Sequence, residues 1–515
     1  MLKSFSESYV SPQDHADTKA IDNNFLFSYL HSQLKDDEIE SLLNQYWNIF
    51  DPVFPLIHKP TFNYKSASCT LVSAMCTVAM LYRSDLKNFS GILCENTLNA
   101  INEPLFCANA SIQTVQAALI LVFYGTFTDK VWYQRCRALH SQIVAVARET
   151  GIFQTNPRDQ CDDEWKSFIV SEERKRVSFC LYMIDSQMAT LLNYPPSLSH
   201  YEIKHPLPCS DTLWQLENAL LWKEKHTLEL SNGERTSFLD ALQQALIFGK
   251  TPKNISSFGS LSILLPIHIM IRNMEQYAGV LEVPKIKAND PFSRKSQLGT
   301  ALNALRSLIP KRGLRKGPKK SHDMWDMFVA TWNLAYIHLH VPDPIITSGI
   351  VEVTLRATIA TAAVLAKPSE WYPPGGTSVS SNNMHLISSH SLSVMVSHIC
   401  YFLKFADFLK ADGGQERSPV FTFMFYKAGL VAWQILHIGL SGRKLESTQD
   451  GTKPVDEEYI MRRLVDDIMS FVEVDDPSEV HDSDELKVFE KWMRTVLVTA
   501  DTWSVGAGAS ASFFF

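Results

Sequence analysis

The strongest local signal for chemistry in this sequence is a run of cationic side chains near its middle. Residues 311–320 carry six cations in ten positions, namely Lys311, Arg312, Arg315, Lys316, Lys319 and Lys320. Such a run can bind the acidic groove of a nuclear import receptor, or it can contact phosphate groups. It can equally be a solvated loop, since Gly313, Gly317 and Pro318 interrupt any regular helix there. The sequence leaves import signal and solvated loop open, and it favours both over direct DNA contact.

Residues that could hold a metal ion or activate a nucleophile do not fall into a recognisable spacing. The nine cysteines are scattered, and no pair has the Cys-x-x-Cys spacing of a zinc finger or zinc cluster. His338 and His340 are two residues apart, which on a helix places them on nearly opposite sides. There is no His-Glu-x-x-His motif and no phosphate-binding loop of the form Gly-x-x-x-x-Gly-Lys-Ser/Thr. We therefore predict that the chain is not an enzyme and that it binds no cofactor or metal.

Two other charged segments allow a functional and an ordinary interpretation. The acidic residues of 473–485, close to Val472 and Phe489, resemble an activation segment, in which charge keeps apolar side chains solvated until a partner binds them. We favour the ordinary interpretation, a polar loop between two helices. Glu172 and Arg176 are four residues apart in a second charged run and would pair on a helix. There we favour a solvated helix face over an effector-binding patch.

Composition and net charge are those of a globular protein that is not basic. The 515 residues are 45% hydrophobic and 20% charged, and this length favours two or more packed sub-regions. The formal net charge of −7 argues against DNA as the main partner of these residues. The scattered cysteines indicate reduced, buried thiols in an intracellular protein. The polar N-terminus lacks the features of a signal peptide, and the longest apolar runs fall short of the roughly 18 residues that span a bilayer.

The elements that would position the charged residues are helices. Gly accounts for only 21 residues, which favours helices over turn-rich β structure. Apolar residues recur at helical spacing, most clearly in 67–83, 111–125, 131–150, 165–193, 324–339, 351–366, 391–409, 421–440 and 457–472. The run 117–122 is apolar all round, as in a helix buried between other helices. The predicted fold class is all-α, a large multi-helix bundle or solenoid-like arrangement in two sub-regions.

The same pattern divides the chain into five parts. They are a flexible arm over 1–22, a helical domain over 23–280, a basic linker over 281–323, a second helical sub-region over 324–472, and an acidic segment with a tail over 473–515. The small residues of 506–512 belong to that predicted tail.

Residues 43–62 form the most distinctive segment of the chain. Its first half is a helical face whose aromatic members are Tyr46, Trp47 and Phe50. Pro52 is expected to end the helix, because a proline disfavours helical geometry at the residue before it. Pro55 and Pro60 then hold an extended apolar strap.

This segment resembles the opening signature of the fungal-specific transcription factor domain, the helical regulatory region that follows a zinc-dependent DNA-binding module in many fungal regulators. The family pattern is roughly a Tyr-Phe helix followed by His-Pro-x-Phe-Pro-x-(Ile/Leu)-His-(Arg/Lys)-Pro-Thr-Phe. The residues that fit it are Tyr46, Pro52, Phe54, Pro55, His58, Lys59, Pro60, Thr61 and Phe62. Asp51 stands where the family usually has a histidine.

A second resemblance to the same family lies downstream, in residues 165–214. It comprises Trp165, the run Glu172-Glu173-Arg174-Lys175-Arg176, the apolar stretch that ends in Asp185, Pro195-Pro196, Leu207-Pro208 and Trp214. Residues 138–152 resemble the family helix that ends in Leu-Gly-Leu, and residues 332–342 resemble a later element more weakly. The resemblance covers residues 40–215 well and 325–440 loosely.

The resemblance assigns residues 23–280 to a regulatory domain and implies a nuclear regulator of RNA polymerase II transcription. A secondary-metabolite gene cluster is a reasonable target, and transcription machinery, a DNA-binding partner or a second copy of the chain are the implied partners, with no membrane. The family's zinc-binding module is absent from this sequence. DNA contact is then expected from a missing exon or from a partner, unless the chain is a degenerate relative. The alternative is a non-enzymatic helical adaptor with no direct DNA role.

Overall fold

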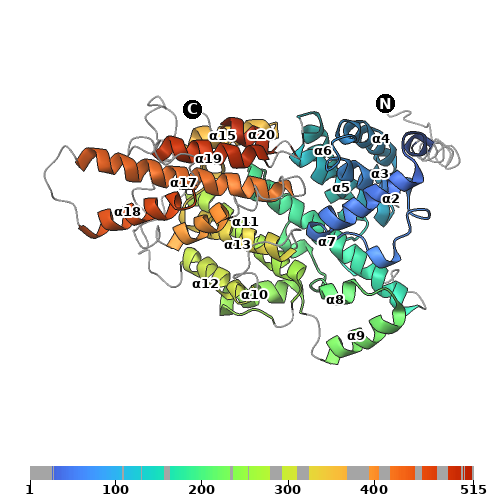
Figure 1. The fold of residues 1–515 in the computed structure, drawn as a ribbon. Helices are drawn as coiled ribbons and strands as arrows, with labels where there is room; N and C mark the ends of the chain where they lie inside the picture. Colours follow the sequence, from blue (N-terminus) through green and yellow to red (C-terminus); the bar gives the residue numbers. More distant parts are fainter. Residues whose placement is uncertain are drawn as a thin grey trace, which may run out of the picture.

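The described part of the chain folds mainly into helices (Figure 1). The computed structural model describes residues 26, 28–106, 110–128, 130–155, 163–231, 236–252, 255–278, 293–309, 324–367, 394–404, 418–446, 455–472, 485–499, 503 and 505–512. Within these ranges the β pairing consists of one isolated bridge between Pro206 and Ser237. The predicted all-α class is confirmed.

The first helices form a compact group on one side of the molecule (Figure 1). They are α2 (Asp36–Gln45), α3 (Cys69–Met80), α4 (Lys87–Phe106), α5 (Ile112–Phe127) and α6 (Lys130–Glu149). Helix α5 begins after Ser111, whose hydroxyl accepts the N–H of Thr114 at 3.1 Å. It packs against α3, α4 and α6, and every residue from Thr114 to Phe127 is buried. The apolar run 117–122 is therefore a helix buried between helices, as predicted.

Gly125 lets α5 and α6 approach closely. A Cβ atom at this position would lie 2.2 Å from Cys136 Sγ and 2.8 Å from Cys136 Cβ. Real Cβ contacts are not that short, so a side chain here would force the two helices apart.

Helix α7 (Glu164–Leu192) runs from this group to the centre of the molecule (Figure 1). It begins after Asp163, whose carboxylate accepts the N–H groups of Trp165 and Lys166. It ends at Asn193, which adopts the left-handed conformation with φ of 60°. The helix packs against α5 and against α11, so it connects the two halves of the fold.

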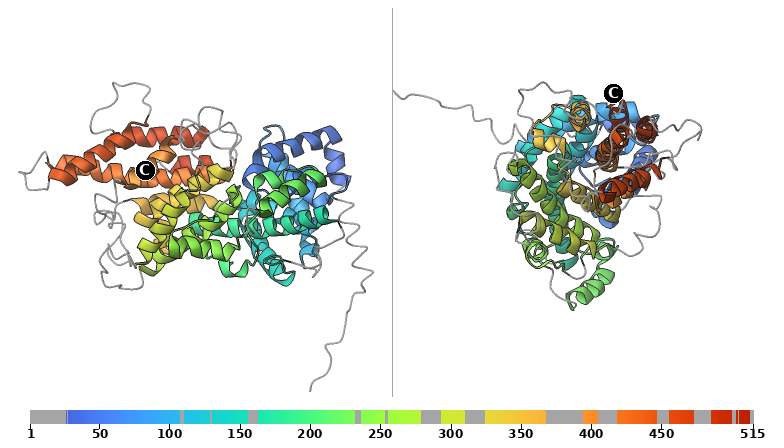
Figure 2. Two further views of the ribbon diagram at one scale, coloured as in Figure 1. Left: turned by 90° about the horizontal axis from the view of Figure 1, so that it is seen from below. Right: turned by 90° about the vertical axis from the view of Figure 1, so that its left-hand side faces the viewer.

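Helices α8 (Asp211–Trp214) and α9 (Ala219–Ser231) lie beside the first half of α7 (Figure 1). The second half contains α10 (Phe238–Phe248), α11 (Ser257–Ala278), α12 (Arg294–Arg306), α13 (Met324–His340), α14 (Pro344–Ser348), α15 (Leu355–Ala366), a helix over Val394–Lys404, α17 (Pro419–Glu446), α18 (Val455–Met469), α19 (Glu485–Thr499) and α20 (Val505–Ser512). Helix α11 packs against α13, and α17 packs against α18 and α19. Figure 2 shows α17 and α18 extending at the end of the molecule opposite α2–α6.

The two halves share one hydrophobic core. A single cluster of buried apolar side chains extends from Leu26 to Ala509. Trp503 illustrates this continuity, because its indole N–H donates to Tyr82 Oη at 3.2 Å and its ring lies 5.6 Å from that of Phe123. A smaller cluster around Trp165, Trp214 and Trp222 lies beside the first half of α7.

Two segments that the sequence analysis assigned to loops are helical. Helix α12 lies inside the predicted linker 281–323 and buries Leu298, Ala301, Leu302 and Leu305. Its apolar face was obscured by the polar composition around it. Helix α20 lies inside the predicted tail 473–515, where small residues allow close contact with α15; a Cβ at Gly508 would lie 3.3 Å from Ile359 Cδ1. Both assignments to irregular structure were wrong.

The aromatic helix of residues 43–62 is not one regular α-helix. Helix α2 stops at Gln45, a π-helical turn follows over Tyr46–Phe50, and a 3-10 turn covers Asp51–Val53. The wider turn brings Tyr46, Trp47 and Phe50 all into the interior. The expected stop at Pro52 therefore falls after a change of helix type that the apolar spacing did not reveal.

One buried helix has the length and apolarity of a membrane span. The stretch Pro419–Leu440 of α17 passes that test by length and composition, contrary to the expectation that every apolar run is too short. Of its most apolar window, 94% is buried inside the protein. A core helix surrounded by other helices has the same composition.

Candidate functional site

The predicted nuclear import signal is not among the described residues. All six of its members, Lys311, Arg312, Arg315, Lys316, Lys319 and Lys320, lie in 310–323, and the acidic residues of 473–484 also lie outside the described ranges. Both interpretations therefore stay predictions.

The two distinctive segments, 43–62 and 165–214, meet in space around His58. The His58 backbone N–H donates to Glu173 Oε1 at 2.9 Å. The buried imidazole lies edge-on to the rings of Trp165 and Trp214, at centroid distances of 5.5 and 4.7 Å. Burial lowers the pKa of His58 to about 4, so the ring is neutral at physiological pH and packs as an aromatic group.

The proline strap is also held from its other side. Gln116 of α5 is buried, and its Nε2 donates to the Leu56 carbonyl at 3.1 Å. The strap therefore lies between α5 and α7, with its polar groups paired to both helices. Residues 54–58 serve packing, which agrees with the interpretation of this segment as core.

The charged run of α7 is buried, so the predicted solvated helix face is wrong. Glu172, Lys175 and Arg176 are 1%, 4% and 1% exposed. Glu172 accepts from Lys175 Nζ at 2.5 Å and from the Cys209 backbone N–H at 2.9 Å, and it lies 3.3 Å from Arg176 Nε. The Arg176 guanidinium lies 4.1 Å above the ring of Trp214. This closed network joins α7 to residues 209–214 and leaves no open patch for an effector.

Asp51 is a desolvated acid at the edge of this network, near the cations Arg176 and Lys59. Its Oδ1 atom has no hydrogen-bond partner. Burial raises the pKa of Asp51 to about 7, although the nearby Arg176 and Lys59 lower it. A carboxyl group in this position is therefore half protonated near neutral pH.

Replacing Asp51 with asparagine should stabilise the protein more at high pH than at low pH. The native state keeps the Asp51 proton up to about pH 7, whereas an unfolded aspartate loses it near pH ~4. The parent protein therefore loses stability as the pH rises through this window, and asparagine does not titrate. Melting temperatures of parent and Asp51→Asn at about pH 5 and about pH 8 check this, since only Asp51 differs between them. If the melting temperatures of parent and Asp51→Asn differ by the same amount at both pH values, the prediction is wrong.

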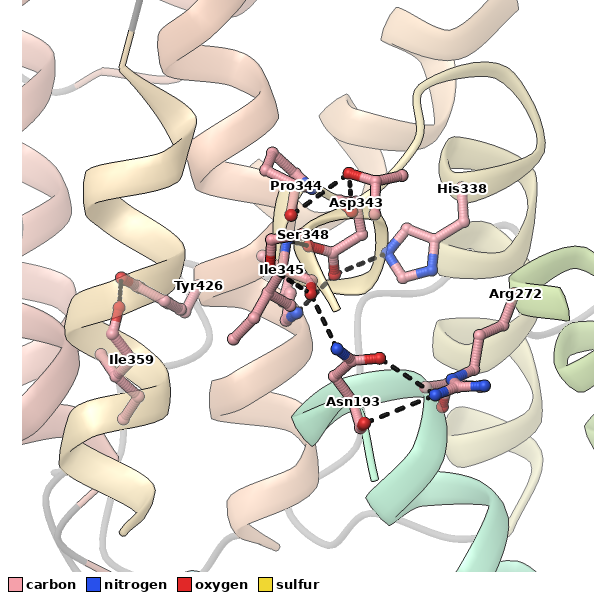
Figure 3. Close-up of polar contacts among 12 residues, drawn as sticks. Asn193, Arg272, His338, Asp343, Pro344, Ile345, Ser348, Ile359 and Tyr426 are labelled. Atoms are coloured by element: carbon pink, nitrogen blue, oxygen red, sulfur yellow. Dashed lines mark hydrogen bonds and ion pairs between the residues drawn. The ribbon is translucent and has the colours of Figure 1, made fainter. Parts of the chain in front are cut away.

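A second buried polar cluster lies where α7, α11 and α14 meet (Figure 3). Asn193 Nδ2 donates to the carbonyls of Ile345 and Ile350, at 2.8 and 2.9 Å. Its Oδ1 accepts from Arg272 at 3.0 Å, and Arg272 Nε donates to the Ala189 carbonyl at 2.9 Å. One left-handed residue thus ties the end of α7 to α11 and to the segment around α14.

Asp343 continues this cluster towards α13 and α17. Its carboxylate accepts from Lys427 Nζ and from the Ile345 backbone N–H, the latter at 3.1 Å. His338 Nε2 lies 3.7 Å from it, and His338 Nδ1 is 3.0 Å from His268 Nε2. Burial lowers the pKa of His338 to about 3. These side chains are at most 5% exposed, so they connect helices and are closed to a substrate.

Buried thiols of the described part of the chain are not poised to bind a metal or to act as nucleophiles. No group of three or more His, Cys, Asp or Glu in those ranges is arranged to hold a metal ion. Burial raises the pKa of Cys76 and of Cys136 to about 12. Such thiols stay protonated and are poor nucleophiles.

One pocket lies beside the end of α7, between α6 and the segment that precedes α15. It has a volume of about 460 Å³ and is lined by Gln134, Arg137, Ala138, His140, Ser141, Asp185, Met188, Tyr194, Pro195, Ser197 and Val353. No motif in the local sequence pattern indicated this pocket. A charged residue inside an apolar helical run, as Asp185 in α7 and Lys427 in α17, is the signal that could have directed attention to these sites.

Comparison with known proteins gives a family for about half of the chain. The model of the family described as "Fungal specific transcription factor domain" matches residues 43–289. These residues include the strap, α7 and Arg272, whereas Asp343 and Lys427 lie beyond the match. No solved structure matches the chain significantly.

Curated proteins match about a third to a half of the chain at low identity. Zinc finger protein klf1 of Schizosaccharomyces pombe is 22% identical over 261 residues, which are 48% of this chain and 33% of that protein. The nicotinate catabolism cluster-specific transcription factor of Emericella nidulans is 22% identical over 244 residues, 44% of this chain and 27% of that protein. Transcription factor verF of Penicillium polonicum is 24% identical over 208 residues, 35% of this chain and 28% of that protein. The matched part of the chain spans about a third or less of each of these relatives.

Proposed function

We propose that this protein regulates RNA polymerase II transcription in the nucleus, because its residues 43–289 match the model of the fungal specific transcription factor domain. The observation that carries the proposal is the meeting of the two family segments at His58, where the strap is bonded to α7. Residues of the two segments that resemble the family signature therefore contact each other in the interior of the protein.

A secondary-metabolite or catabolic gene cluster is the proposed target. One relative supports a gene cluster by its name, the nicotinate catabolism cluster-specific transcription factor. The sequence has no Cys-x-x-Cys pair. We therefore propose that DNA contact comes from a DNA-binding partner or from a segment encoded outside these residues, and that this chain is the regulatory, non-enzymatic part.

The proposal is tested by tethering the chain to DNA. Fusion of the whole chain to an unrelated DNA-binding domain should change expression of a reporter that carries the matching operator. Deletion of the gene should in parallel change transcripts of its target genes. If neither reporter expression nor the transcript profile changes, the proposed regulatory function is wrong and the helical adaptor is favoured.

Replacing the six cations of 311–320 with alanine should move a fluorescent fusion of the chain from the nucleus to the cytoplasm. The reason is the loss of the charge that an import receptor's acidic groove would bind. Fluorescence microscopy measures the distribution, and an added strong import signal should restore it, which separates lost import from lost folding. An unchanged distribution would instead support the solvated-loop interpretation.

A further inference from the structure

The pocket beside the end of α7 carries two opposite charges that do not pair with each other. It lies between α6, the end of α7 and Val353, and it includes Asp185 and Arg137. Its volume of about 460 Å³ is in the range of small-molecule sites, roughly 300–1,000 Å³. It is therefore large enough for one small ligand and polar enough to orient it.

Asp185 is buried without a cationic partner. It is 3% exposed, and its carboxylate accepts the backbone N–H groups of Ser197 and Leu198 at 2.9 and 3.0 Å. Within the described part of the chain, no Lys or Arg nitrogen lies within 4.0 Å of it; the ring nitrogen of His140, at 3.5 Å, is its one such neighbour. Burial lowers the pKa of His140 to about 4, so this neighbour is neutral and does not offset the charge.

His140 itself has an unused polar atom in this pocket. The residue is 3% exposed, and its Nε2 atom, the one that lies 3.5 Å from Asp185 Oδ1, makes no hydrogen bond to a described residue. Buried polar atoms are almost always paired. A ligand that fills the pocket could supply the missing partner.

Arg137 brings the opposite charge. Its guanidinium lies 3.9 Å from the centre of the Tyr194 ring, and that ring is anchored because Tyr194 Oη donates to the Glu352 carbonyl at 2.6 Å. No described carboxylate forms an ion pair with Arg137. A guanidinium stacked on a ring keeps its edge N–H groups free to bind a carboxylate in its plane.

We propose that this pocket binds a small zwitterion with an apolar side chain, of the α-amino acid type. Arg137 would pair with its carboxylate and Asp185 with its ammonium group, while His140 Nε2 completes the polar contacts. Met188 and Val353 line the same pocket and supply apolar contact for the side chain. A purely anionic ligand would bring no opposite charge to Asp185, and a purely cationic one would bring none to Arg137.

Such a ligand would act on the contact between the two halves of the fold. Asp185, Met188 and Tyr194 belong to the family domain, whereas Val353 belongs to the segment beyond it. Asn193, next to Tyr194, already bonds to Ile345 and Ile350. The site is argued from geometry alone, but its use as an effector site rests on the proposed function.

Binding is measured on the purified full chain by calorimetry and thermal shift, with the twenty L-amino acids as probes. At least one apolar amino acid should bind and raise the melting temperature. Its N-acetyl and amide derivatives, which each lack one charge, should bind about tenfold more weakly or worse. If none of the twenty amino acids binds, the proposed site is wrong. If either derivative binds as tightly as the parent amino acid, the site does not require a zwitterion.

Two arginine variants provide the matched comparison. Arg137→Gln should lose about tenfold or more in affinity while its circular dichroism stays that of the parent. Arg135→Gln on the same helix, whose arginine pairs with Glu95 at 3.3 Å outside the pocket, should bind as the parent does. Equal affinity of Arg137→Gln and parent would overturn the site.

The effector role has its own readout. In the tethered reporter assay, the amino acid that binds should change expression of the parent and not of the Arg137→Gln variant. If an amino acid binds but does not change reporter expression, the effector role is wrong and the binding site is still supported. If the tethered chain changes reporter expression but no amino acid binds, the binding site is wrong and the regulatory function is still supported.

Discussion

Replacing Glu172 with alanine is expected to lower the free energy of unfolding by about 3–5 kcal/mol. The carboxylate is 1% exposed and is shared by Lys175 and Arg176, which are also buried. Its removal takes away the ion-pair partner of two buried cations and the acceptor of the Cys209 N–H. Arg176 then keeps its contacts with Cys209 Sγ and the Trp214 ring. Urea unfolding of the purified chain, followed by far-UV circular dichroism, measures the change.

The control for this prediction lies on the same helix. Glu164 pairs with Lys223 at 3.3 Å, but their side chains are 71% and 69% exposed. Glu164→Ala should therefore change stability by less than about 1 kcal/mol. A second variant, Glu172→Gln, keeps the shape of the side chain and removes only its charge. If Glu172→Ala and Glu164→Ala have equal effects, the buried network contributes nothing and the prediction is wrong.

Replacing Asp343 with alanine should have an effect of similar size, about 3–5 kcal/mol, at the contact between the two halves. The Lys427 side chain is 3% exposed and pairs with Asp343. Without the Asp343 carboxylate, the buried Lys427 ammonium loses its ion pair. The first turn of α14 also loses the acceptor of the Ile345 N–H. The same urea unfolding experiment measures the loss.

A double variant separates the charge from the packing. Asp343→Asn with Lys427→Met removes both charges and keeps the volumes, so it should recover much of the stability lost in Asp343→Ala. Glu95→Ala breaks the half-exposed pair with Arg135, in which the side chains are 53% and 46% exposed, and should cost less than about 1 kcal/mol. A double variant as unstable as Asp343→Ala would show that the unpaired charge is not the cause.

The helices themselves could be predicted closely where their apolar period is strong. The predicted range 165–193 is helix α7, Glu164–Leu192, and the range 324–339 is α13, Met324–His340. This works because one buried face imposes a repeat that can be read within a few turns. The apolar repeat does not reveal a helix whose apolar face is narrow, as in α12. It also does not reveal a helix made mainly of Gly, Ala and Ser, as in α20.

The candidate sites could be predicted much less well. The spacing of Glu172 and Arg176 indicated that they pair, and they do lie 3.3 Å apart. It did not indicate burial, because burial depends on the segment around Cys209 and Trp214 folding over α7. The pocket was missed entirely, since Arg137 and Asp185 are ordinary helical residues until the tertiary structure brings them together.

By itself the sequence determined the all-α class, most helix positions and the resemblance to a fungal transcription factor domain, because each depends on residues close together in the chain. Only the tertiary structure decided which charges are buried and what they bind. Asn193 reaches the Ile345 carbonyl across 152 positions, and Lys427 reaches Asp343 across 84. Local periodicity states that a helix has an apolar face, but not which distant helix covers it.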